Sequence, residues 1–568
     1  MSGRLLLFLG ILPVLLACGS SPVQPVSRTE PQGPSSAVAQ ASRTLVFIAR
    51  AEPSSMGRSG GIGIDTSPRF FNATLMIRDG EGSPQPQLAE VLPQLGSASW
   101  QVNPDGTMET TYRLKPNLVW HDGEPFSADD LVFAWQVHRD LQYGPTVGTP
   151  GAPPDSLMDQ ATAPDPQTFI VHWREVYPYA GLLSEEFRPL PRHVLEPLYQ
   201  QVTPEQWDNL PFWTKAYVGL GAYRIDQWEP GAFIEGVAFD RYVFGRPKID
   251  RLRLIFQQDP NAVTASLLSG AAHLVADITI RFETGRILQQ AWASGDGGTV
   301  LYTPAQVRFT RFQLRPEAAS PRAILEPDFR KAIAHAIDKQ ALADALYEGQ
   351  GTPAEVFAPE RAPQFPSMLR AATKYPHDPR QAQDLLERLG FSKGADGIYG
   401  RAAEGPLSLE WRATEGGDSS VQVGVLTDAL RQVGIDAHPF ILPRPFDNQT
   451  RASFPGLMNW STVGQPDDWL MDFTSAKRAT AENRWSGINF GGWSKPEYDR
   501  LAETLATSLD LATRTNTMVQ MTQVMSEEVP VLPLYYSLDV VAHVAALRGV
   551  KVARDGSIAW NVEQWELK

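Results

Sequence analysis

The sequence predicts a large protein of the mixed α/β class. Apolar runs typical of strands alternate with helical patterns along the chain, instead of standing in separate blocks. The 47 prolines and 45 glycines separate these segments with many turns. With 568 residues, 42% hydrophobic and 20% charged, the chain is long enough to build two or three lobes around their own cores.

The first half of the chain supplies strands and one clearly marked helix. Residues 44–49 (TLVFIA) form a short apolar run suited to a buried strand. Residues 110–114 alternate in polarity and follow the turn-forming residues 103–106 (NPDG), which predicts a second strand. Ser127 and Asp130 have the spacing of a capping box and predict the helix that follows them.

The second half continues the same mixture. Pro327 and residues 378–379 (DP) each predict the start of a helix, because proline suits the first helical position. Ser494 and Glu497 have capping-box spacing and predict another helix. Residues 531–536 (VLPLYY) predict a strand near the end of the chain.

The N-terminus has the pattern of a bacterial lipoprotein signal. Arg4 precedes an apolar run at residues 5–16, and residues 15–18 (LLAC) form a lipobox that ends at Cys18, the only cysteine. We therefore expect residues 1–17 to be removed and Cys18 to carry acyl chains that anchor the protein. The alternative is an ordinary cleaved signal peptide followed by an incidental cysteine.

The segment after the cysteine predicts a tether. Residues 18–42 are rich in Ser, Pro, Gln and Ala and have no periodic apolar positions. Such a segment cannot bury enough surface to offset the entropy of ordering, so we expect it to be disordered. The folded part is expected to begin near residue 43.

Composition and motifs exclude several classes of function. A formal net charge of −14 argues against nucleic acid as a partner. Residues 57–61 (GRSGG) match G-x-S-x-G but lack the strand and helix of a nucleophile elbow, and residues 121–123 (HDG) predict a turn instead of a catalytic pair. The nine histidines show no metal-binding spacing, and no cofactor-binding loop is found. We expect neither an enzyme nor a cofactor or metal.

One long block and six shorter ones carry a family resemblance. Residues 112–133 (YRLKPNLVWHDGEPFSADDLVF) resemble a signature of the family 5 extracellular solute-binding proteins, the peptide-binding components of ABC importers. The resemblance runs from about residue 88 to residue 544. The shorter blocks follow in the family's order at residues 219–223 (GLGAY), 228–231 (WEPG), 267–270 (LLSG), 329–339 (FRKAIAHAIDK), 489–494 (NFGGWS) and 530–535 (PVLPLY).

The resemblance implies a two-lobe fold of the periplasmic-binding-protein type, of the large class with an extra subdomain. Mixed sheets with flanking helices form both lobes, the ligand cleft lies between them, and crossover strands lie near Tyr302 and Val531. The expected parts are lobe I at 43–302 with an inserted subdomain at about 80–205, lobe II at 303–530, and a return to lobe I at 531–568.

The resemblance also implies a function. The protein is expected to capture an oligopeptide-like solute as the lobes close, and to deliver it to ABC permease subunits. It would do so as a monomer anchored on the extracytoplasmic face of the membrane. The alternatives are a ligand-sensing or scaffold lipoprotein of the same fold, or a receptor for a non-peptide solute such as an oligosaccharide.

The sequence departs from the family where peptide binders hold the ligand's ammonium group. Those members carry an aspartate three residues after a tryptophan, but here Val463 follows Trp460 at that spacing. An unpaired ammonium is costly to bury. Asp467 or Asp468 could supply a displaced carboxylate, or these two residues could solvate a loop or cap a helix.

A different ligand is the other interpretation of that departure. Trp460, Trp485 and Trp493 lie in the region that lines the family's cleft, where they could stack on apolar or sugar faces, although tryptophans in a core would explain them equally well. The candidate ligand-binding residues are Trp460, Val463, Asp467, Asp468, Trp485, Asn489 and Trp493.

Overall fold

A ten-stranded mixed sheet connects the two lobes of this protein. The computed structural model describes residues 43–57, 66–147, 153–183, 187–295, 297–402, 404–462, 465–553 and 557–568, so Cys18, residues 58–65 and Val463 lie outside the described residues. The strand order is β18 (Asp436–Leu442), β17 (Ser408–Thr414), β19 (Leu457–Thr462), β13 (Gly298–Phe312), β20 (Val531–Val544), β12 (Leu274–Val275), β1 (Thr44–Ala49), β11 (Arg251–Phe256), β10 (Phe233–Ala238) and β9 (Tyr223–Glu229).

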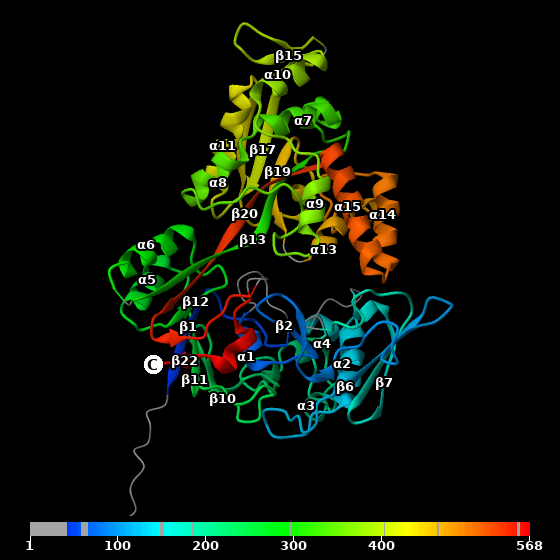
Figure 1. Ribbon diagram of the computed structural model, residues 1–568, viewed down its shortest axis with the longest axis vertical. Helices are drawn as coiled ribbons and strands as arrows, with labels where there is room; N and C mark the ends of the chain where they lie inside the picture. The colour runs from blue at the N-terminus through cyan, green and yellow to red at the C-terminus, as the bar shows by residue number, and fades with distance from the viewer. Residues whose placement is uncertain are drawn as a thin grey trace, which may run out of the picture. The chain divides into compact units, whose positions relative to one another are not determined.

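Two long neighbouring strands at the centre of this sheet serve both lobes. β13 and β20 pair antiparallel along most of their length, and Figure 1 shows them crossing side by side. Val540 of β20 belongs to the first hydrophobic core, whereas Leu532 of the same strand belongs to the second. The strand predicted at Val531 is therefore confirmed, and it continues beyond the predicted segment to Val544.

The first core is built mainly by the N-terminal part of the chain. β1 has the bounds predicted from its sequence, and α2 begins directly after Ser127, whose N–H donates to Asp130 Oδ2 at 2.9 Å. A five-stranded sheet with the order β4-β6-β8-β7 and β5 beside β6 lies here as well. The elements of this part are α1 (Thr66–Phe71), β2 (Met76–Arg78), β3 (Pro84–Pro86), β4 (Ala89–Val91), β5 (Trp100–Val102), β6 (Met108–Leu114), α2 (Ala128–Arg139), β7 (Met158–Asp165), β8 (Thr168–Trp173), α3 (Arg192–Leu195), α4 (Pro204–Asp208), α5 (Pro260–Leu268), α6 (Phe282–Trp292), β21 (Leu547–Arg548) and β22 (Glu566–Leu567).

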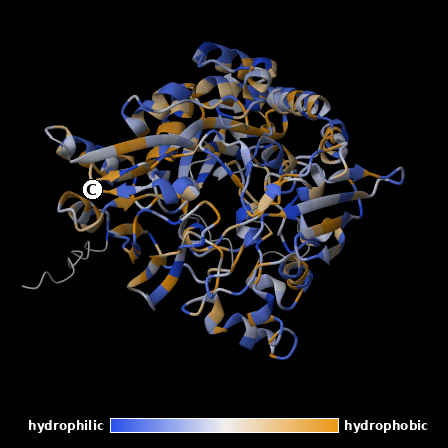
Figure 2. Cartoon of the chain, turned by 60° about the horizontal axis from the view of Figure 1, so that its bottom comes forward, coloured by the Kyte–Doolittle hydropathy of each residue, from blue (hydrophilic) through white to orange (hydrophobic). Residues whose placement is uncertain are grey.

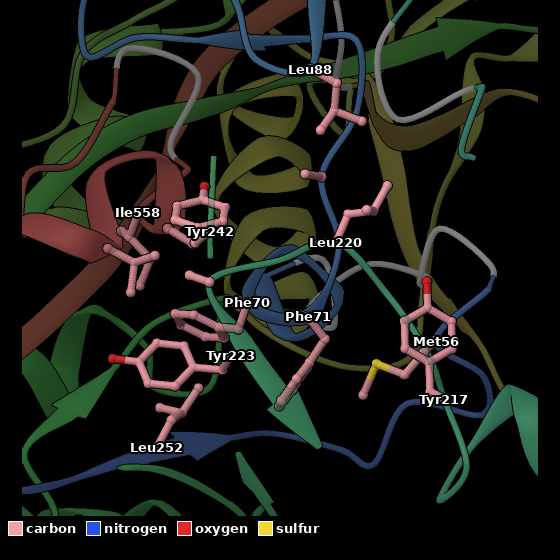
Figure 3. Packing of buried hydrophobic residues seen from close by; sticks show 14 of the residues in the cluster. Met56, Phe70, Phe71, Leu88, Tyr217, Leu220, Tyr223, Tyr242, Leu252 and Ile558 are labelled. Carbon is pink, nitrogen blue, oxygen red and sulfur yellow. The ribbon is translucent and has the colours of Figure 1, made fainter. Parts of the chain in front are cut away.

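The GLGAY block at residues 219–223 is architectural. The Gly221 N–H donates to the carbonyl of Phe71 at 3.1 Å, and a Cβ on Gly221 would lie 2.3 Å from the Phe71 carbonyl carbon. Figure 3 shows Phe70 and Phe71 packed in the core beside Leu220 and Tyr223. Only glycine permits this approach of two backbone segments.

His121 of the HDG block is also structural, as its turn sequence predicts. Its Nδ1 accepts from the Gly219 N–H at 3.2 Å, so Nε2 carries the proton and donates to the Gly221 carbonyl at 3.0 Å. Burial lowers the pKa of His121 to about 4, which keeps the ring neutral. The imidazole therefore joins the signature block to the GLGAY block.

The second part of the chain contains the remaining helices and three further cores. α7 and α10 begin at the predicted prolines. The capping box predicted at Ser494 is wrong, because α14 begins at Pro496 with Lys495 as its cap, and Ser494 instead bonds to Ser475. The elements are α7 (Pro327–Ala336), α8 (Lys339–Tyr347), α9 (Phe365–Ala371), α10 (Pro379–Arg388), β14 (Ser392–Lys393), β15 (Tyr399–Arg401), β16 (Gly405–Pro406), α11 (Ser419–Gln432), α12 (Asn448–Ala452), α13 (Pro466–Met471), α14 (Pro496–Thr507) and α15 (Leu511–Glu528).

Hydropathy differs between the strands and the loops of the protein. In Figure 2, hydrophobic residues recur along the strands, whereas hydrophilic residues dominate many of the loops. Among the described residues, no helix is both long enough and apolar enough to cross a membrane.

Candidate functional site

The register between β13 and β19 places an aromatic and basic cluster on one face of the large sheet. Phe309 lies directly opposite Trp460, and Arg311 lies opposite Met458. Side chains two residues apart on a strand share a face, so Phe309 and Arg311 lie on the same side as Trp460. This arrangement surrounds the tryptophan that the sequence singled out.

Trp460 is half-buried and lies close to two guanidinium groups. The Cζ of Arg311 is 5.2 Å from the ring centroid, and that of Arg451 in α12 is 5.1 Å away. Phe490 packs edge-on against the same ring, with centroids 6.0 Å apart. Both cations also lie over Phe490, at 4.9 Å for Arg311 and 4.3 Å for Arg451. We name Arg311, Arg451, Trp460 and Phe490 the Trp460 cluster.

Arg311 is the most unusual member of this cluster. Only 2% of the residue is exposed, yet neither Nε nor Nη1 has a hydrogen-bond partner among the described residues. Burial lowers the pKa of Arg311 to about 9, with attraction by Asp472 and repulsion by Arg451 as smaller contributions. The side chain is therefore a buried cation with unused donors.

The surrounding charges leave the cluster electropositive. Burial, reinforced by repulsion from Arg444, lowers the pKa of Arg451, and its buried Nε has no hydrogen-bond partner within the described part of the chain. Asp472 is the acid that attracts Arg311, and burial raises the pKa of Asp472 to about 6, so at neutral pH this carboxylate is mainly ionised and offsets only one of the two guanidinium charges. No ion pair joins Asp472 to Arg311 among the described side chains. The local excess of positive charge contrasts with the net charge of −14 of the whole chain.

The structure places the two candidate aspartates in α13. Asp467 is buried, and its Oδ2 accepts from Nη2 of Arg514 at 2.5 Å. Asp468 Oδ2 accepts from the N–H of Gln465 at 3.2 Å and caps the helix. Both carboxylates therefore have partners within the protein. For Asp468 this agrees with the alternative interpretation that these acids cap a helix.

Asn489 and Trp493 hold the loop that follows α13. The Asn489 side-chain amide donates to the carbonyls of Phe473, Thr474 and Trp493, and its oxygen accepts from the N–H groups of Gly492 and Trp493. Trp493 is 6% exposed and packs against Tyr498 with centroids 4.8 Å apart. These two residues stabilise the protein's own chain.

Trp485 completes the group of three tryptophans. It is half-buried, has a φ of 61°, and lies 5.9 Å from the Cζ of Arg315. It packs partly against the fourth core, as Trp460 also does. Two of the described candidates, Trp460 and Trp485, thus differ from the others. Their side chains are only half-buried and do not hold a helix or a loop by hydrogen bonds.

Arg311 and Arg451 are site residues that the sequence patterns did not predict. A signal for Arg311 is present at residues 307–312 (VRFTRF), where Val307 and Phe309 establish an apolar face and Arg311 continues it in phase. A charged residue in phase with a buried strand face indicates either a buried ion pair or a binding site. Nothing local marks Arg451, since the rings beside it, Trp460 and Phe490, lie outside its own helix.

The comparisons with known proteins agree with the observed architecture. Residues 90–482 match the model of the bacterial extracellular solute-binding proteins, family 5 Middle. The chain belongs to this family. The resemblance found in the sequence is thereby confirmed. The family consists of extracytoplasmic substrate-binding proteins of transport systems and is not a family of enzymes.

Individual family relatives are distant from this chain. A Brucella ovis protein named as an ABC transporter peptide-binding protein is 26% identical over 300 residues, 52% of this chain and 51% of that protein. The match therefore spans about half the length of this curated relative. An oligopeptide-binding protein of Thermus thermophilus, solved with a pentapeptide, is 20% identical with a TM-score of 0.70, covering 92% of this chain and 96% of that one.

A further family structure carries a different ligand. NikZ of Campylobacter jejuni, solved with Ni(L-His), is 20% identical with a TM-score of 0.70, covering 92% of this chain and 99% of that one. These likenesses confirm the predicted two-lobe periplasmic-binding-protein fold. The ligands in the two solved family members differ, so the fold alone does not specify a solute.

Proposed function

We propose that this protein is the substrate-binding lipoprotein of an ABC-type importer, which captures an oligopeptide-like solute between its lobes and delivers it to the permease. The observation that carries the proposal is the Trp460 cluster on a central strand of a family 5 fold, where a half-buried aromatic ring lies beside unused hydrogen-bond donors. Aromatic rings with a few polar groups are typical of small-molecule sites. Trp485 is a second ring that such a solute could contact.

Capture requires that the solute bind one arrangement of the lobes more tightly than the other. A solute that contacts both lobes stabilises the closed arrangement, and about 5.5 kcal/mol of differential binding moves the equilibrium from mostly open to mostly closed. β13 and β20, the long strands shared by the lobes, are the segments that would bend during this motion. The permease would then recognise the closed form.

Mass spectrometry of solutes that co-purify with the full-length protein tests solute capture directly. The protein should be extracted from its own membranes and the bound fraction released by mild denaturation. Peptides present in stoichiometric amounts would support the proposal, and an empty protein that also retains no peptide from a synthetic library would overturn it.

Membrane anchoring through Cys18 is tested separately. The wild-type chain should partition into the detergent phase of a cloud-point extraction and yield a triacylated N-terminal peptide. Cys18→Ser should remain in the aqueous phase with unchanged solute capture. A wild-type N-terminus without acyl chains would overturn the lipoprotein part alone.

A further inference from the structure

The start of α15 and the turn before it contact the opposite lobe. Arg514 of α15 donates through Nη2 to the hydroxyl of Tyr179 at 3.1 Å, and its Cζ lies 5.2 Å from the centroid of that ring. Leu509, in the turn between α14 and α15, packs against the first core, whereas both helices contribute side chains to the third core. Tyr177, two residues before Tyr179, also packs against the first core. These contacts therefore join the first core to the third.

Arg514 is held in place by groups of its own lobe. Its Nη2 donates to Asp467 Oδ2 at 2.5 Å, and its Nη1 donates to the carbonyls of Leu505 at 2.6 Å and Ser508 at 3.3 Å. A guanidinium fixed by such partners loses little side-chain entropy when it forms one more hydrogen bond. If the lobes separated, the contact with Tyr179 would break, but the charge of Arg514 would stay paired with Asp467. The contact can therefore open and close without leaving a buried charge unpaired.

Tyr179 is presented by a row of packed rings. It packs edge-on against Tyr177, with centroids 5.9 Å apart, and Tyr177 packs against Trp173 with centroids 5.1 Å apart. Trp173 is buried in the first core, and its Nε1 donates to Thr110 Oγ1 at 2.9 Å. The row therefore connects the ring of Tyr179 to strands β6 and β8 of the five-stranded sheet.

Helix α6 makes a different kind of contact beside the crossover strands. Phe282 of α6 packs against Tyr302 of β13 with centroids 5.2 Å apart, and Arg286 of the same helix donates to Glu348 Oε2 at 3.1 Å. Figure 1 shows α6 and α15 on opposite sides of β13 and β20. Because α6 rests on the strands proposed to bend, its contacts can persist while the lobes move. The contact between Tyr179 and Arg514 joins segments that such a motion would separate.

We propose that Tyr179 and Arg514 form a latch that holds the two lobes together before a solute is bound. This inference rests on the proposed function, because it concerns the lobe closure by which that function captures a solute. Arg514 contributes a charged hydrogen-bond donor and the ring of Tyr179 a cation–π contact, and both stabilise the closed arrangement. A solute must wait for this contact to open, so the latch slows its entry.

Single-molecule fluorescence energy transfer measures the latch without any solute. The full-length chain carries Cys18→Ser and dyes on Gln101→Cys in β5 and Glu503→Cys in α14, two exposed positions in different lobes. Mild denaturation and refolding remove any co-purified solute beforehand. The closed population is the one whose transfer efficiency matches the dye separation in this structure, and the protein with Tyr179 intact should show it without added solute.

Two substitutions of Tyr179 should reduce that population by different amounts. Tyr179→Phe keeps the ring but loses the hydroxyl that accepts from Arg514, so it should lower the ratio of closed to open molecules about three- to tenfold. Tyr179→Ala loses the ring as well and should lower the ratio at least about tenfold. Thermal unfolding of each variant shows whether it is folded, and Tyr179→Phe carries the test if Tyr179→Ala does not fold.

Tyr199→Phe is the matched control. The hydroxyl of Tyr199 donates to Asp140 Oδ2 at 2.9 Å, and its ring packs against the first core. This variant loses the same atom and a hydrogen bond to a charged group, but within one lobe. It should therefore leave the ratio of closed to open molecules unchanged.

The outcomes separate the latch from solute capture. A protein with Tyr179 intact that shows no closed population, or an unchanged ratio in folded Tyr179 variants, would overturn the latch and leave solute capture in place. A fall of the same size in Tyr199→Phe would also overturn it, because the effect would then not come from the contact between the lobes. Failure to retain any peptide from the library would overturn oligopeptide capture alone, since the ratio is measured without solute.

Discussion

Arg514 in α15 and Asp467 in α13 form a buried ion pair in which Nη2 and Oδ2 lie 2.5 Å apart. The same guanidinium donates to the hydroxyl of Tyr179 at 3.1 Å, with its Cζ 5.2 Å from the ring centroid. Burial raises the pKa of Asp467, and the charge of Arg514 opposes that rise. Arg514 therefore links two helices of one lobe to the N-terminal part of the chain.

Removing Arg514 should destabilise the protein strongly. In Arg514→Met the carboxylate of Asp467 remains buried without its cation, which costs about 3–5 kcal/mol in free energy of unfolding. Adding Asp467→Asn to that variant should recover part of the loss, because the amide carries no charge. Urea unfolding at pH 7, followed by circular dichroism, measures both effects.

The exposed Arg500 of α14 offers a control for this comparison. Arg500→Met should change the free energy of unfolding by less than about 0.5 kcal/mol, as surface substitutions usually do. A loss below about 1 kcal/mol in Arg514→Met would show that the buried carboxylate of Asp467 does not depend on Arg514.

This ion pair also marks the limit of what the sequence could predict. Pro466 and the two acids after it indicate a helix start, and the structure has one there. The partner of Asp467 lies 47 residues away and is brought near only by the packing of α13 against α15. Local patterns predicted several helix starts and strands, although they misplaced the cap of α14, and they do not specify which distant side chains meet.

The same distinction applies to the candidate site. Trp460 was identified from its place in a family pattern, whereas Arg311 became notable only after the register of β13 and β19 showed the rings around it. Asn489 shows the reverse. The sequence predicted it as a ligand-binding residue, but its side-chain amide forms hydrogen bonds to backbone groups of the protein. Site chemistry depends on which hydrogen-bonding groups remain unused, which only the three-dimensional arrangement reveals.

Trp460 and Trp493 should respond differently to truncation. Trp460→Ala is expected to reduce capture of the peptide library at least about tenfold with a small change in stability, because the ring is half-buried and borders the proposed site. Trp493→Ala should lower the free energy of unfolding by about 3–5 kcal/mol, because that ring is core. Capture by mass spectrometry and unfolding by urea distinguish the two, and undiminished capture by Trp460→Ala would remove this ring from the site.

Asp539 should make stability depend on pH. It lies in β20, where burial and then repulsion by Asp277 raise its pKa to about 6 against opposing attraction from Arg308 and Arg361. A carboxyl group whose pKa is higher in the folded than in the unfolded state contributes stability at low pH and loses it as the pH rises through about 6. Asp539→Asn, which stays neutral, should therefore be more stable than the wild type at pH 7.5.

Thermal midpoints at pH 4.5, 6.0 and 7.5 measure this effect. The advantage of Asp539→Asn should be roughly 1–3 °C at pH 7.5 and should shrink towards pH 4.5. The exposed Asp384 in α10 gives a control variant, Asp384→Asn, whose difference from the wild type should not change over this range. An Asp539→Asn advantage that grows as the pH falls would contradict the assigned direction.

Gly221 should tolerate no side chain. A Cβ at this position would lie 2.3 Å from the carbonyl carbon of Phe71 and 2.4 Å from the backbone N of Asn72, so backbone segments and not flexible side chains would have to move. Gly221→Ala should therefore lower the free energy of unfolding by more than about 3 kcal/mol and disturb the hydrogen bond from Gly221 to Phe71. At Gly295 a Cβ would meet nothing within 4 Å, so Gly295→Ala should change stability by less than about 1 kcal/mol. Thermal unfolding of the two alanine variants compares them directly, and equal midpoints would mean that the segment at residues 219–223 can move away from Phe71 without loss.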